Sequence, residues 1–208
     1  MTSRRSRRVL RAALALAIIA GILVILRPWT AVPIETTAMR AFNAEEYVKS
    51  VWHSRLLPTA EGTAVELQMF TQGTVGAVGT DGGPMRAAFV KGTARIAEVD
   101  RKSRVGLARL QSLRATDRQA AIQIGPVLRG TALRDALGFI RFTDFVNQLE
   151  FASVANALNE RVISDVIGPI DFDGLGGREV TFVGAVALSA ASTLEIVPVR
   201  LQVSGGVK

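Results

Sequence analysis

Polar side chains that could bind a ligand are concentrated in one otherwise apolar stretch of the sequence, residues 120–163. Among its phenylalanines, leucines and valines stand two arginines with carboxyl, hydroxyl and amide neighbours: Arg129, Thr131, Arg134, Asp135, Asn147 and Gln148. The planar donors of arginine match carboxylates and hydroxyl groups, and amides add directional hydrogen bonds. These six residues are the candidate ligand-binding residues, and they suit an anion or the hydroxyls of a sugar.

The same side chains could instead form a closed structural network, because buried polar groups are normally satisfied within the protein. Arg134 or Arg129 would then pair with Asp135 or Glu150, and Asn147 would bond to backbone groups in the bend. A structural network and a small-molecule pocket both remain open at this point.

The local structure of this stretch follows from its capping residues. Residues 132–137 are expected to form one or two helical turns, with Thr131 as the N-cap and Gly138 closing the helix. Asn147 and Phe151 are four residues apart, so they share a side in either a helix or a strand. We therefore expect Asn147 to face the apolar side.

The sequence lacks the residue patterns that most enzymes use for catalysis. The sequence contains no cysteine and one histidine, His53, which excludes thiolate and multi-histidine metal sites. No glycine-framed turn presents a serine nucleophile, and the glycines between Gly73 and Gly83 lack a phosphate-loop ending. A hydrolase built on Asp135 and Glu150 ranks last, because nothing in the sequence raises the pKa of either carboxyl group. We expect no enzyme, no metal and no cofactor.

The positive charge of the chain lies at its N-terminus. Residues 1–27 contain six arginines and no acidic residue. Removing these six from the 25 basic residues leaves 19, against 18 acidic residues, so the formal charge falls from +7 to +1. Without a basic patch on the body, a nucleic-acid partner is not expected.

The first 30 residues are predicted to form an uncleaved signal anchor. The apolar run 12–26 has 15 residues, between the length of a signal-peptide core and that of a membrane span. Arg27, Pro28 and Trp29 stand where a cleavage site would be, and Trp29 suits a membrane interface. The preceding arginines favour the cytoplasm. This predicts a single-pass inner-membrane protein with its body in the periplasm.

Residues 31–84 are expected to contain a linker, a small helical domain and a glycine-rich loop. Asn43 is a suitable N-cap, and apolar residues then recur at helical spacing until Pro58 marks the expected end. A second short helix is expected over 63–70.

Residues 85–208 change to a strand pattern. Strands are expected over 88–99, 105–110, 121–124, 180–188 and 194–203, with Gly92 at a bend or bulge and Pro198 at an edge or bulge. A helix near 145–164 interrupts them, with an apolar stripe through Phe151, Ala155, Leu158 and Val162. The fold class is therefore α+β, a small barrel of antiparallel type with an inserted helix.

The segment GPVLRGTALRDALGFIRFTDFVNQLEFASVANALNERV resembles an uncharacterised bacterial family of predicted periplasmic lipoproteins. The resemblance extends to AEEYVKSVWHSRLLP, KGTARIAEVD, GREVTFVGAVAL and EIVPVRLQV. It implies a small helical domain joined to a barrel related to the OB-fold, and a gene often encoded beside sugar-type ABC transporters. No catalytic residues come with it. Many members carry a lipidated cysteine, which this sequence lacks, so the anchor here is expected to be the helix.

Two functions are consistent with these features. The first is a membrane-anchored extracytoplasmic accessory or ligand-binding protein, with a small polar ligand or ABC transporter components as partners. The second is a non-enzymatic structural envelope protein that binds a protein partner through its barrel.

Overall fold

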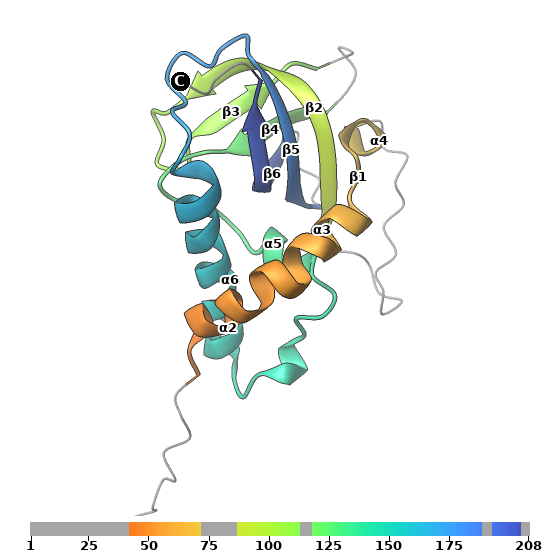
Figure 1. Cartoon of the computed structure of the whole chain (residues 1–208), viewed down its shortest axis with the longest axis vertical. Helices are drawn as coiled ribbons and strands as arrows, with labels where there is room; N and C mark the ends of the chain where they lie inside the picture. The colour runs from red at the N-terminus through yellow and green to blue at the C-terminus, as the bar shows by residue number, and fades with distance from the viewer. Residues whose placement is uncertain (1–41, 72–86, 113–117, 189–192, 205–208) are drawn as a thin grey trace, which may run out of the picture. The chain divides into compact units, whose positions relative to one another are not determined.

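Five strands of the computed structural model close into a barrel (Figure 1). The structure describes residues 42–71, 87–112, 118–188 and 193–204. Around the barrel the order is β2 (Ala87–Asp100), β3 (Leu107–Leu110), β4 (Gln119–Gln123), β6 (Thr193–Val203) and β5 (Glu179–Ala187), and β5 pairs back with β2. The predicted α+β barrel with an inserted helix is confirmed.

The long strand β2 closes the barrel because it serves two partners. Its first part pairs antiparallel with β5 and its last part with β3, and the register shifts between Ile96 and Glu98. A bulge of this kind bends a strand toward a new neighbour. The bulge that was one of the two alternatives at Gly92 is wrong, since Gly92 pairs in regular register with Phe182.

One pairing within the barrel departs from the expected antiparallel type. Strands β4 and β6 run parallel, from Gln119 opposite Thr193 to Ile122 opposite Ile196. A parallel pair needs a long crossover, and the inserted helix lies within the chain that connects these strands. On β6, Pro198 lies at a register shift opposite β5, which confirms its prediction as a bulge residue.

The first helix is longer than predicted. Asn43 caps α2 (Ala44–Val51) by accepting hydrogen bonds from two backbone N–H groups, as expected. The helix then continues through a π-helical segment, η1 (Trp52–Leu56), into α3 (Leu57–Thr63). Pro58 does not end it. The proline lies in the first turn after the wide π turn, where its missing N–H is tolerated.

After this helix the chain makes a short contact with the barrel. The expected helix over 63–70 is replaced by β1 (Val65–Glu66), parallel to β2, and then α4 (Leu67–Thr71). Among the described helices, none has the length and apolar character needed to cross a bilayer. The predicted anchor and the glycine-rich loop lie outside the described residues.

The inserted segment contains α5 (Ala132–Asp135), the 3₁₀ turn η2 (Phe142–Asp144), α6 (Gln148–Val162) and the π-helical segment η3 (Ile163–Ile167). The predicted stripe on α6 faces inward: Ala155, Leu158 and Val162 are buried and Phe151 is half-buried. One continuous hydrophobic core joins α2 and α6 to the barrel strands. The turn that follows β4 and carries Arg129 is therefore held between the barrel and α6.

Candidate functional site

Arg134 is the centre of a closed structural network. Its Nε and Nη2 donate to one Asp135 oxygen at 2.9 and 2.7 Å, and its Nη1 donates to the Phe151 carbonyl at 3.2 Å. The guanidinium also stacks over the Phe151 ring, 3.8 Å from its centroid. Only 11% of the Arg134 side chain is exposed. Arg134 therefore joins α5 to α6, as the network alternative expected.

Arg129 has a different environment. Its backbone N–H donates to the Gln123 side-chain oxygen at 2.7 Å, and its Nη2 donates to a Glu195 oxygen at 2.7 Å. The Gln123 side chain, which is buried, donates to the other Glu195 oxygen at 3.0 Å. The Arg129 side chain is nevertheless 59% exposed. Among the described residues, its Nε and Nη1 have no hydrogen-bond partner.

A glycine turn separates the two arginines. Gly130 has φ +85°, a left-handed conformation that glycine adopts readily. Its carbonyl accepts a hydrogen bond from the buried Asn159 side chain of α6 at 3.1 Å. Thr131 was expected to cap α5, but its side chain makes no capping hydrogen bond. Its hydroxyl donates instead to Asp135 at 2.6 Å. The helix α5 also ends earlier than predicted, at Asp135.

These residues border a cleft of about 400 Å³, which we call the Arg129 cleft. It lies between the turn at α5 and one face of the β4–β6 pair. Three of the six sequence-predicted residues line it, together with three polar residues from the strands and small or apolar neighbours: Arg129, Thr131, Asp135, Gln123, Thr193, Glu195, Gly130, Ala132, Ala187 and Val197. The volume lies within the range of small-molecule sites.

Asn147 and Gln148 do not line the cleft. Asn147 is exposed and is the N-cap of α6, where its side chain accepts from the Glu150 backbone N–H at 2.9 Å. The expectation that it faces the apolar side is wrong, because an N-cap residue has extended backbone and lies outside the helix that contains Phe151. Glu150 accepts from the Val146 backbone rather than from an arginine.

Gln123, Glu195 and Asn159 were missed by the sequence reasoning. A weak signal existed for two of them. Glu195 lies two residues before Val197 and Gln123 two residues after Ala121, so each places a polar group on an apolar strand face. Asn159 had no comparable signal, because a polar residue that follows an apolar one in an amphipathic helix usually lies on the exposed face.

Two other hollows are less suited to a ligand. One, of about 80 Å³, lies near Thr93 and Phe182 and is too small for more than a few waters. The other, of about 260 Å³, is bordered by Asp165 and Arg200. The described residues contain no group of histidine, cysteine or acidic side chains that could hold a metal ion.

The polar groups of the second hollow are engaged elsewhere. Arg200 binds Glu61. Asp165 accepts from the Ser164 hydroxyl and from Arg161 Nε, each at 2.6 Å. The hydrogen bond from Ser164, with the charge of Arg161, holds the pKa of the Asp165 carboxyl below its ordinary value of 3.8. This hollow is also smaller than the Arg129 cleft described above.

Comparisons with known proteins agree with this architecture. A family model described as "Predicted periplasmic lipoprotein (DUF2291)" matches residues 13–202. A crystal structure of an OB-fold protein from Thermotoga maritima is similar over 79% of this chain and all of that chain, with 18% identity and a TM-score of 0.61. At that identity the likeness shows the fold alone, and it confirms an OB-like barrel.

Two further results add little. The S. pombe Stn1–Ten1 complex matches over 60% of this chain and 62% of that chain, at 13% identity and a TM-score of only 0.27, and we infer nothing from it. No curated protein matches the sequence.

Proposed function

Since the chain belongs to this family of predicted periplasmic lipoproteins, we propose that it is a membrane-anchored extracytoplasmic protein that binds a small polar ligand in the Arg129 cleft. One observation carries the proposal. Arg129 is fixed by Glu195 and by the buried Gln123, yet its side chain is 59% exposed and lines a cleft large enough for a sugar. A preorganised donor of this kind is typical of a binding residue.

The charges in the cleft favour a neutral ligand over an anion. Arg129 is matched by Glu195, and Asp135 by Arg134, so the site carries no excess positive charge. An anion would meet two carboxylates. A sugar hydroxyl can accept from Arg129 and donate to a carboxylate at the same time. We therefore propose a neutral sugar, bound without turnover, as the ligand class.

The family and the apolar run support the place that we propose for the protein in the cell. The family supports an extracytoplasmic body. This sequence has no cysteine to carry a lipid, and residues 12–26 offer an apolar anchor in its place. We propose that this segment holds the protein at the outer face of the inner membrane, where it would serve a sugar uptake system such as an ABC transporter.

Isothermal titration of the full chain in phosphatidylcholine nanodiscs tests ligand binding. The probes are glucose, galactose, ribose and xylose, with glucuronate as the acidic counterpart. We expect heat with a neutral sugar, weaker heat with glucuronate, and none for Arg129→Ala. Arg101→Ala is the matched control, because Arg101 is also about as exposed (57%) and binds Asp173 at 2.9 Å away from the cleft. Absence of heat with every probe, or equal heat for Arg129→Ala, contradicts the proposal.

A further inference from the structure

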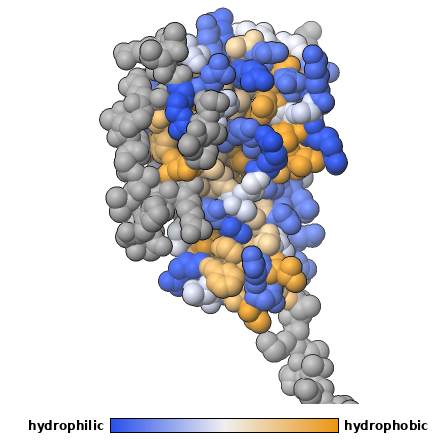
Figure 2. Space-filling model, turned by 180° about the vertical axis from the view of Figure 1, so that it is seen from behind, coloured by the Kyte–Doolittle hydropathy of each residue, from blue (hydrophilic) through white to orange (hydrophobic). Residues whose placement is uncertain are grey.

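Exposed apolar side chains are concentrated in one short segment of the described chain. Of the four large hydrophobic residues that are exposed in the described chain, three lie within eight residues: Phe142 at 54%, Val146 at 75% and Leu149 at 81%. We call this group the apolar tip. It lies at the lower end of the molecule in Figure 1, where α2 and α6 begin, and hydrophobic side chains reach the surface at that end in Figure 2.

The apolar tip is held in place by the structure behind it. Phe142 contacts Phe151, and Phe145 contacts Phe151, with ring centroids 5.6 Å apart in both pairs. Val146 precedes the N-cap of α6, a position whose apolar side chain usually packs onto the helix four residues inside. Here Val146 remains exposed, while its backbone N–H is fixed by Glu150 at 3.1 Å. The tip therefore presents apolar surface from an ordered base.

The charges around the apolar tip favour contact with an apolar surface rather than with a charged partner. Between Phe139 and Leu149 the only charged residues are Arg141 and Asp144, which pair at 3.4 Å. The first turn of α2 carries two further exposed charges, both acidic, Glu45 and Glu46. Neither feature attracts anionic lipid, so contact with the tip must depend on apolar burial.

The short stretch of chain between the proposed anchor and Phe42 favours the membrane as the partner of the apolar tip. Phe42 is part of the same ring cluster, 5.4 Å from Phe145 between centroids. Only 15 residues, 27–41, separate it from the apolar run 12–26, which limits the distance between them to about 50 Å even for a fully extended chain. The proposed anchor therefore keeps the tip at a high effective concentration near the bilayer.

We propose that Phe142, Val146 and Leu149 dock into the interface of the membrane that holds the anchor. The inference rests on the anchoring in the proposed function. Three exposed side chains are too few for a stable protein interface, which buries about 1,200–2,000 Å². They suffice as the second of two membrane signals.

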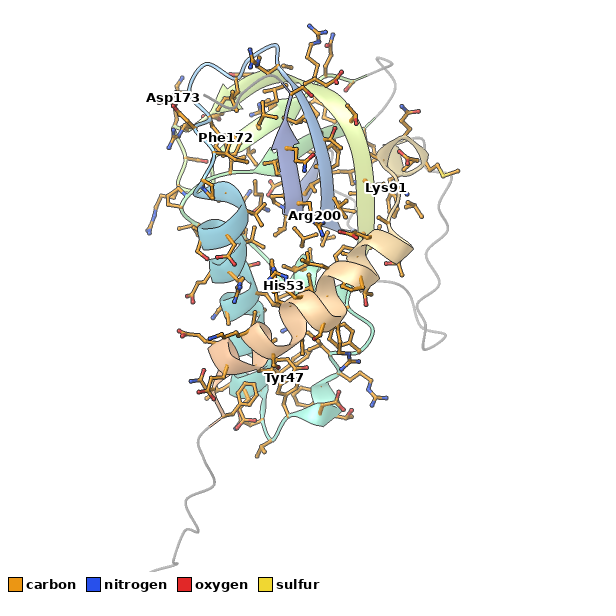
Figure 3. The ribbon with its side chains drawn as sticks, in the orientation of Figure 1. Tyr47, His53, Lys91, Phe172, Asp173 and Arg200 are labelled. Atoms are coloured by element: carbon orange, nitrogen blue, oxygen red, sulfur yellow. The ribbon has the colours of Figure 1, made fainter. Side chains whose placement is uncertain are left out.

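Nitroxide accessibility on the full chain in phosphatidylcholine nanodiscs tests the docking. Because the sequence has no cysteine, Gln148→Cys gives a single label site beside the tip. Asp173→Cys is the control site: its side chain is 77% exposed, and it lies at the end of the molecule opposite Tyr47 (Figure 3). We expect the label at 148 to collide more often with oxygen than with a water-soluble nickel complex, and the label at 173 to do the reverse.

Two variants separate docking from anchoring. Val146→Ser with Leu149→Ser should make the label at 148 accessible to nickel, while the chain still co-elutes with the nanodisc. Met69→Ser removes an exposed hydrophobic residue of α4 and should change neither reading.

Three results would overturn the docking. A nickel-accessible label at 148 in a co-eluting chain overturns docking alone. Dipolar broadening between labels at 148 assigns the surface to a second copy of the chain instead. Failure of the unmodified chain to co-elute overturns the anchoring itself and, with it, the docking.

Discussion

Arg129 and Arg134 lie five residues apart, each beside a carboxylate, and their environments differ. Arg134 is enclosed: its donors reach Asp135 and the Phe151 carbonyl, and an aromatic ring covers it. Arg129 bonds to Glu195 on one side and is open on the other. A buried guanidinium without spare donors stabilises a fold, whereas a fixed but open one can hold a ligand. The difference divides one polar stretch into a structural part and a candidate site.

The largest effect is expected for Arg134→Ala. The substitution leaves the half-buried Asp135 carboxylate without its arginine and removes the link between α5 and α6. We expect the free energy of unfolding to fall by about 3 kcal/mol, measured by urea denaturation. Arg134→Lys keeps the charge without the forked donors and should lose less. A loss below about 1 kcal/mol for Arg134→Ala would contradict the structural role.

Asn159→Ala connects the two parts, because Asn159 holds the Gly130 turn between the arginines. Loss of one buried hydrogen bond should lower the free energy of unfolding by about 1–2 kcal/mol. Sugar binding should also weaken, because the turn that positions Arg129 loosens. Asn156→Ala, at an exposed position of the same helix, is the matched control for both measurements. If the Asn159→Ala protein is destabilised but binds the sugar as well as the unmodified chain, the Gly130 turn does not position Arg129 for binding.

Arg129→Ala should show the opposite pattern to Arg134→Ala. The ion pair with Glu195 is largely exposed on the arginine side, so its loss should change the free energy of unfolding by at most about 1 kcal/mol. The heat of sugar binding should disappear. Calorimetric melting and titration on the same sample measure both quantities. A large drop in stability would place Arg129 with Arg134 in the structural network.

The smallest effect is expected for Asp165→Asn, which removes the ion pair with Arg161. The pKa of Asp165 is lowered in the folded protein, so its contribution to stability is complete above about 3.8 and is lost as the pH falls below that value. Solvent screening limits this contribution to at most about 1 kcal/mol. Urea denaturation of Asp165→Asn and the unmodified chain should therefore differ at pH 6 and converge at pH 2–3. A difference that persists at low pH would contradict this origin.

Most of the architecture could be predicted from the sequence, because it depends on local patterns. Alternation predicted the strands, and the stripe through Leu158 and Val162 predicted the inserted helix. The errors arose where tertiary structure overrides a local rule. Pro58 continues a helix because a π turn precedes it, and the bulge of β2 lies between Ile96 and Glu98 rather than at Gly92.

The candidate site could be predicted only in part. Arg129, Thr131 and Asp135 are close in sequence and were found together. Glu195 comes from the last strand, 66 residues after Arg129, and reaches it through the parallel β4–β6 pairing. A pairing over that separation depends on the topology of the barrel, which short patterns do not contain. Asn147 was misplaced because four-residue spacing applies only within one element.

The most direct test of the contrast between the two arginines is NMR hydrogen exchange of their Nε–H groups, assigned through Arg129→Ala and Arg134→Lys. The Nε–H of Arg134, bonded to Asp135, should exchange slowly and should not respond to a sugar. The Nε–H of Arg129 should exchange quickly, and its resonance should shift when the neutral sugar that gives heat in calorimetry is added. Slow exchange at both arginines, or an Arg129 resonance unmoved by every neutral sugar, would contradict a binding role for the cleft.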